Sequence, residues 1–220
     1  MHIRTTRMEA FSDGVIAIII TVMIFDIKFR DLAHGFTHND VQVGFRMLWP
    51  KIAAYAFSFL VLGTMWLNHH HMYHLVQIVD EKLMWFNLNF LFWLSLIPLP
   101  TSMIGRNPFL PESVAMYGAA MFMVSVSFLL MRGYVHRQGL MRQDSRKINK
   151  ELDRVNSRVR YKSMIGLAAY AAAVPAAFTS VYLSYGLFVI PVALFFIPDG
   201  VAAASDDKPV VREEIRERAI

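Results

Sequence analysis

Residues 7–28 read RMEAFSDGVIAIIITVMIFDIK, and this stretch decides the fold class. Its polar residues gather at the two ends, and only Thr21 interrupts the apolar middle. A bilayer-spanning helix needs roughly 20 mostly apolar residues, and the segment from about Met8 to Lys28 has that length. It lacks the small-residue cleavage site of a secretory signal peptide. We therefore predict that it is a membrane helix of the mature protein.

The rest of the chain repeats this pattern. Of its 220 residues 55% are hydrophobic and 18% charged, which is typical of a bilayer protein whose loops carry the charges. Five further apolar segments lie at about 48–75, 83–104, 114–134, 162–183 and 185–198. The last two are almost contiguous and could form one bent segment. We predict an all-α integral membrane protein with six transmembrane helices in one domain, residues 1–200, followed by a polar tail, residues 201–220.

The orientation follows from a basic segment between the fourth and fifth spans. Ten Lys and Arg residues lie between Arg132 and Lys162, and the positive-inside rule places such a loop, here about 135–161, in the cytoplasm. An even number of spans then puts both termini in the cytoplasm. Within the loop, apolar residues recur every three or four positions. This spacing predicts a helix that extends a membrane span or lies on anionic lipid, in preference to a nucleic-acid-binding surface. The apolar residues are Ile148, Leu152, Val155 and Val159.

Prolines inside the apolar segments leave two interpretations open. Each removes a backbone donor and bends its helix, and bilayer helices tolerate this where neighbouring groups satisfy the freed carbonyls. Such kinks are the simpler interpretation, and a broken-helix substrate site is the alternative. The residues concerned are Pro98, Pro100, Pro175 and Pro191.

The first helix presents two different faces. At about 100° per residue, an apolar stripe contains Phe11, Ile18, Val22 and Phe25, while Asp13 lies about 140° from Ile18. An acidic residue at this depth is costly unless it is paired. The Asp13 face must therefore meet protein, whereas the stripe could meet lipid, core or a hydrophobic constriction.

Two motifs resemble one family. Arg7, Phe11, Ser12 and Asp13 form an R-x-x-x-F-S-D motif that resembles the signature of the transmembrane protein 175 family of potassium channels. The second apolar segment ends in Trp66-Leu67-Asn68-His69-His70, which is similar to the W-x-x-H-H stretch of that family. The resemblance extends through Asp26-Ile27-Lys28 and covers nearly the whole chain.

The resemblance implies an assembly and a pore. In the family each subunit contributes its first helix to a central pore, and single-unit members form homotetramers in the prokaryotic plasma membrane. By position, Ile18 is the narrowest ring, Val22 and Phe25 form further rings, and Thr21 is the selectivity layer. Phe25 is bulkier than the aliphatic residue usual there. The implied partners are the bilayer, identical subunits and permeant monovalent cations, chiefly K⁺, with no cofactor.

A hydrophobic constriction is physically consistent with this resemblance. Four isoleucine side chains around one axis can close a pore by dewetting. The sequence contains no T-V-G-Y-G loop, so a carbonyl selectivity filter is not predicted. The alternative is a secondary ion-coupled transporter that uses the intramembrane Asp13. A membrane enzyme is not expected, because no catalytic constellation is present.

The remaining motif residues are predicted to form a structural network. We expect Asp13 to accept a hydrogen bond from Trp66 or His69, which would fix the rotation of the first helix, with Arg7, Ser12 and His70 nearby. His70 and His74 are four positions apart, as in metal-binding pairs. Because no third ligand follows by spacing, network histidines are preferred to a metal site, with a pH-sensing role as an alternative.

Overall fold

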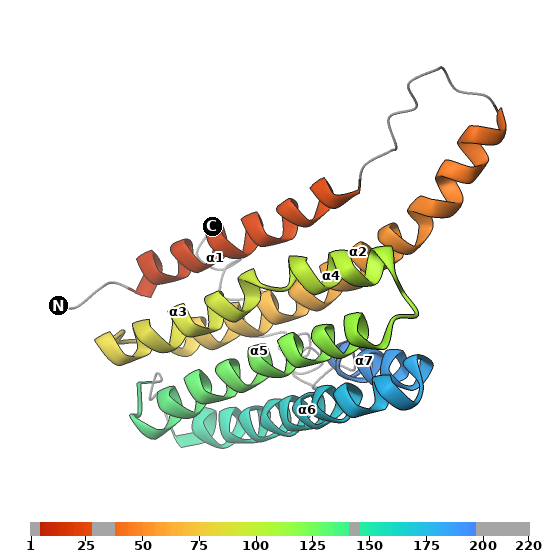
Figure 1. Ribbon diagram of the computed structural model, residues 1–220. Coiled ribbons are helices and arrows are strands. Elements are labelled where there is room, and N and C mark those ends of the chain that lie inside the picture. The colour runs from red at the N-terminus through yellow and green to blue at the C-terminus, as the bar shows by residue number, and fades with distance from the viewer. Residues whose placement is uncertain (1–4, 28–37, 141–145, 197–220) are drawn as a thin grey trace, which may run out of the picture.

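The computed structural model describes residues 5–27, 38–140 and 146–196, and nearly all of them are helical. Figure 1 shows the helices running side by side. This confirms the predicted all-α fold, although the predicted tail, residues 201–220, lies outside the described residues. The elements in chain order are α1 (Thr5–Val22), the 3₁₀ turn η1 (Met23–Asp26), α2 (His38–Leu75), α3 (Glu81–Ser95), α4 (Pro98–Arg106), α5 (Pro111–Arg137), α6 (Arg146–Thr179) and α7 (Val181–Phe196).

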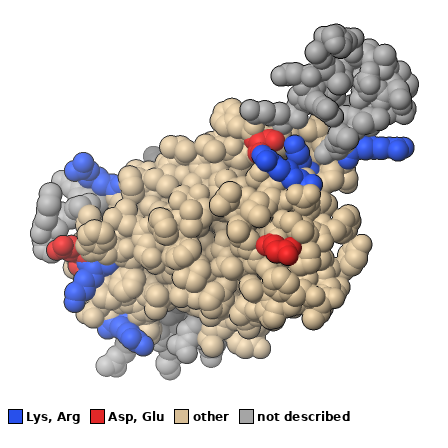
Figure 2. Space-filling model, in the orientation of Figure 1, with Lys and Arg blue, Asp and Glu red and all other residues tan. Residues whose placement is uncertain are grey.

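The first four predicted spans are present as long apolar helical segments. Within the described residues, the segments long and apolar enough to cross a membrane are Thr5–Asp26, Leu48–His74, Glu81–Arg106 and Pro111–Arg137. A shorter apolar helix covers Val181–Phe195. The charged side chains fit this distribution. In Figure 2 most of the visible face is uncharged, and most of its Lys, Arg, Asp and Glu side chains lie towards its two ends.

The third span is broken in the middle. Helix α3 ends at Ser95, and α4 begins with Pro98 as its first residue. Proline has no N–H to donate to the carbonyl of Leu94, and the backbone N–H of Ile97 takes its place at 3.1 Å. The break is therefore a proline kink whose freed carbonyl is satisfied locally.

The fifth and sixth predicted spans are two helices, and their boundary differs from the prediction. Helix α6 ends at Thr179 and α7 starts at Val181, whereas the sequence placed the boundary near residue 184. The Ser184 hydroxyl donates to the Ala173 carbonyl at 2.8 Å, which holds α7 back against α6. Apolar sequence continues through this turn, so hydropathy does not mark it.

The basic segment is largely part of α6. Because this helix runs without interruption from Arg146 to Thr179, it extends the fifth span, which is the first of the two predicted alternatives. The side chains of the predicted stripe from Ile148 to Val159 lie outside the described residues.

Helix α1 lies at one side of the bundle. It packs against α2 and α3, while α5, α6 and α7 pack together on the other side (Figure 1). Between them is a continuous apolar core that includes Leu62, Leu83, Phe90 and Met121, each fully buried. One face of α1 therefore meets its own subunit and the other does not.

Candidate functional site

The inner face of α1 is set by residue spacing. Met8, Ser12, Ile16, Ile19 and Met23 are buried and recur every three or four positions, which places them on one side of the helix. This side packs against α2 and α3. Burial of this face fixes which residues α1 turns outward.

The outer face carries the apolar stripe predicted from the sequence. Phe11 is 53% exposed, Ile18 62%, Val22 45% and Phe25 71% in the single subunit. Phe25 differs from the prediction in one respect, because it lies in the 3₁₀ turn η1 and not in the α-helix. These are large apolar side chains in a row, and exposed rows of this kind mark contact with another surface or with lipid.

Thr21 lies beside the stripe and is exposed. Its hydroxyl lies 2.9 Å from the Ala17 carbonyl and 3.0 Å from the Ile18 carbonyl, so it donates to its own helix. A hydroxyl has one proton and two lone pairs. The oxygen of Thr21 therefore keeps acceptor capacity on the outer side of α1.

Asp13 faces inward and is paired. The Trp66 indole N–H donates to its carboxylate at 2.8 Å. Of the two donors predicted for Asp13, the structure thus shows Trp66. The Trp66 ring also stacks on the ring of His70, with centroids 5.5 Å apart. The contact connects the middle of α1 to the last turns of α2.

The second predicted donor, His69, belongs to a neighbouring chain of hydrogen bonds. Its Nε2 lies 2.8 Å from the Asn87 side-chain oxygen, and the Asn87 amide donates to Ser12 at 2.9 Å. Ser12, His69 and Asn87 are all fully buried. Asn87, on α3, was missed by the sequence analysis because it belongs to no motif there.

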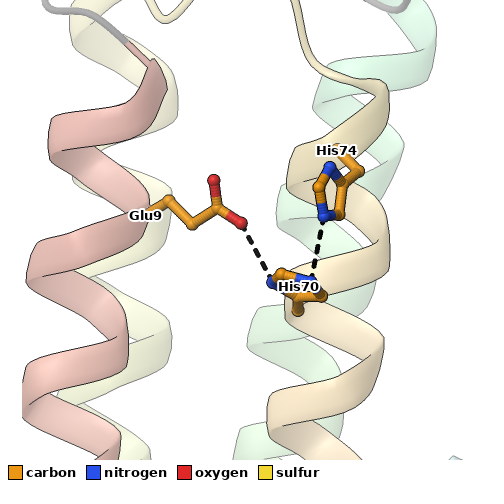
Figure 3. Close-up of side chains that lie close together, drawn as sticks. All are labelled: Glu9, His70 and His74. Carbon is orange, nitrogen blue, oxygen red and sulfur yellow. Dashed lines mark hydrogen bonds and ion pairs between the residues drawn. The ribbon is translucent and has the colours of Figure 1, made fainter.

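Glu9 makes a further contact from α1 to α2. Its carboxylate lies 2.9 Å from Nδ1 of His70, and Nε2 of His70 lies 3.0 Å from Nε2 of His74 (Figure 3). Glu9 and Asp13 are one helical turn apart, as are His70 and Trp66, so the two contacts form successive rungs between antiparallel helices.

The predicted network residues do not all come together. Arg7 is exposed in the first turn of α1, and Phe11 points to the outer face with the stripe. Ser12, Asp13, Trp66 and His69 point into the subunit. In the turn η1 that follows α1, Asp26 forms an ion pair with Arg106 of α4 at 2.7 Å. Contacts at both ends therefore fix the rotation of α1 against its own subunit.

This arrangement defines the class of protein to which the chain belongs. It is a multi-spanning helical membrane protein whose first helix is fixed by polar contacts on one face and presents an apolar stripe on the other. A family model described as "Endosomal/lysosomal potassium channel TMEM175" matches residues 7–98. A relative from Chryseobacterium sp. named as a potassium channel is 32% identical over 193 residues, which cover 88% of this chain and 93% of that protein. The chain therefore belongs to the TMEM175 family of potassium channels.

Two further similarities bear on the fold and on the ion. The crystal structure of a lysosomal potassium-selective channel TMEM175 homologue from Chamaesiphon minutus has a TM-score of 0.68 and 24% identity, and the match covers 90% of this chain and 98% of that one. This likeness supports the fold alone. A human relative named as an endosomal/lysosomal proton channel is 28% identical over 129 residues, covering 58% of this chain and 25% of that protein.

Membership in the family decides between the classes that the sequence left open. The family is one of ion channels, so the chain is a membrane channel protein and not an enzyme. The transporter alternative is not favoured, because the family model and the Chryseobacterium relative are both described as potassium channels.

Proposed function

We propose that four copies of this chain form a potassium-preferring channel in which the four α1 helices surround the pore. Ile18 is the narrowest ring, Val22 and Phe25 form wider rings, and Thr21 provides a polar layer between them. The assembly lies in the prokaryotic plasma membrane with both termini in the cytoplasm. K⁺ is the permeant ion, and conduction needs no cofactor.

The observation that carries the proposal is the exposed stripe on α1. A single subunit leaves Phe11, Ile18, Val22 and Phe25 between 45% and 71% exposed, although the opposite face of the same helix is buried and held by polar contacts. The polar contacts of Ser12, Asp13 and Asp26 fix the rotation of α1, so the stripe faces away from its own subunit. Fixed rotation is useful where one residue of the helix must point to a symmetry axis.

The side chains of the stripe explain how such a pore closes and how it selects between ions. A ring of isoleucine side chains excludes water at a narrow radius, so ions cross it only by losing part of their hydration. The oxygen of Thr21 retains lone pairs that can replace some of that hydration. K⁺ holds its water less tightly than Na⁺, so a partial-dehydration barrier favours K⁺ modestly.

The test is single-channel recording of the purified protein in planar bilayers under a potassium–sodium gradient. Wild type is compared with Ile18→Asn, which replaces the apolar ring with amides of similar size. Leu60→Asn is the matched control, because Leu60 is 48% exposed on α2 and lies outside the stripe. A pH gradient in separate recordings measures proton current, the activity named for the human relative.

Three results decide the proposal. We expect a reversal potential that favours K⁺, a conductance several-fold larger and less selective in Ile18→Asn, and wild-type currents in Leu60→Asn. Equal currents in wild type and Ile18→Asn would remove Ile18 from the pore. A reversal potential that follows the pH gradient would replace K⁺ with H⁺ as the main permeant ion.

A further inference from the structure

The contact between Glu9, His70 and His74 has the composition of a metal site. One ligand atom from each residue lies within 4.8 Å of the other two. Figure 3 shows Glu9 reaching from α1 towards the two histidines of α2. His70 and His74 are partners on one helical face, and Glu9 supplies the third ligand that the spacing of the histidines could not reveal.

The three ligand atoms are near enough to meet at one ion after a side-chain rotation. Zinc binds histidine nitrogen and carboxylate oxygen at about 2.0–2.2 Å in tetrahedral geometry, so its ligand atoms lie about 3.3 Å apart. The Glu9 carboxylate lies 2.9 Å from Nδ1 of His70, whereas Nε2 of His74 lies 3.0 Å from the other ring nitrogen of His70, Nε2. Because one ion can bind only one nitrogen of His70, the His74 ring would have to turn towards the Nδ1 side, and the three ligand atoms lie within 4.8 Å of one another. His74 is exposed at this site, so its ring has room to turn.

The donor set selects the kind of metal. Two imidazoles and one carboxylate suit Zn²⁺ and similar divalent transition metals, whereas Mg²⁺ prefers oxygen ligands and retains its water. Three protein ligands leave a fourth tetrahedral position for water. The His70 ring is also held in place for binding, because it stacks on the Trp66 ring, with ring centroids 5.5 Å apart.

We infer that Glu9, His70 and His74 form a binding site for a divalent transition metal such as Zn²⁺, which clamps the N-terminal part of α1 to the end of α2. The ion bridges two helices whose polar contacts here include the Glu9–His70 contact and the Trp66–Asp13 hydrogen bond. Binding to the folded state alone stabilises it by mass action. The inference concerns this chain's own fold and does not depend on the proposed pore.

The test measures Zn²⁺ binding to the full-length protein in detergent by calorimetry, with thermal unfolding as a second readout. Mg²⁺ at the same concentration is the ion control. The variants are Glu9→Gln and His74→Asn, which remove one ligand from each helix. His71→Asn is the matched control, since His71 is an exposed histidine of the same helix outside the cluster.

We expect wild type and His71→Asn to bind one Zn²⁺ per subunit and to unfold at a higher temperature with Zn²⁺ than with Mg²⁺. Glu9→Gln and His74→Asn should raise the dissociation constant for Zn²⁺ at least about tenfold. Both variants should also lose the rise in unfolding temperature that Zn²⁺ causes. Wild-type affinity in both ligand variants would overturn the inference. So would equal weakening in His71→Asn, because it would show that the histidines bind Zn²⁺ non-specifically.

Discussion

Asp13 is the residue on which the position of α1 depends most directly. A carboxylate in a membrane helix is costly unless it is paired, and here the Trp66 indole is its partner at 2.8 Å. Hydrogen bonds to charged groups contribute about 1.5–3 kcal/mol. Trp66→Phe keeps an aromatic ring but removes the N–H donor and part of the ring volume. We expect it to lower the free energy of unfolding by at least that amount, measured by thermal unfolding in detergent.

A double-mutant cycle isolates this hydrogen bond. We expect Trp66→Phe to cost less stability in the Asp13→Ala background than in wild type, since the hydrogen bond is already absent there. Trp49→Phe is the control, because Trp49 is a 69% exposed tryptophan of the same helix. Additive losses in the double variant would show that Trp66 and Asp13 act independently.

The sequence could predict part of this residue network. The depth of Asp13 in an apolar helix requires a partner, and the motif that contains Trp66 and His69 supplies polar groups. Asn87 and Glu9 could not be found in this way. Asn87 contacts Ser12 across 75 positions, and Glu9 finds His70 only because α1 and α2 are antiparallel. Such pairings depend on helix register, which spacing within one segment does not determine.

At the scale of elements, α2 and α4 approach each other through a glycine. A Cβ added at Gly105 would lie 3.1 Å from the Cα of Lys51, which is backbone and cannot move aside cheaply. Small residues let membrane helices pack this closely. We expect Gly105→Ala to destabilise the protein by about 1–3 kcal/mol, the usual cost of overpacking, in the same unfolding assay.

Gly133→Ala is the control for Gly105→Ala. A Cβ at Gly133 of α5 would have no atom within 4 Å, and alanine favours the helix over glycine by about 1 kcal/mol. We therefore expect Gly133→Ala to be neutral or slightly stabilising. If both variants lose stability equally, close packing at Lys51 is not the cause.

The elements themselves were predictable to different degrees. The first four spans follow from long apolar runs, and the two faces of α1 follow from its period. The boundary at Ser180 did not follow, because long apolar segments flank the short polar pair Thr179-Ser180 on both sides. The break between α3 and α4 was predicted only as a kink, since proline shows where a donor is missing but not that Ile97 satisfies the Leu94 carbonyl.

At the scale of the whole molecule, the subunit has a shared apolar core and exposed apolar side chains around it. The α5–α6–α7 side buries large aromatic residues such as Tyr117, Tyr170 and Phe188 within the chain. On the opposite side, Ile18 of α1 and Phe25 of η1 are exposed. Large apolar side chains are exposed on the other side as well, for example Leu130 at 53% and Phe178 at 63%. In the proposed assembly, copies related by a rotation axis would cover the exposed side of α1.

The proposed assembly predicts a definite mass. Closed cyclic symmetry is the usual form of homo-oligomers, and the proposed pore requires four copies of the 25.2 kDa chain. We expect native mass spectrometry of the detergent-solubilised protein to give four times the subunit mass. Ile18→Asn should keep this mass if the side chain faces an open axis. A wild-type monomer or dimer would contradict the four-helix pore, whereas a tetramer that dissociates in Ile18→Asn would place Ile18 in a subunit contact.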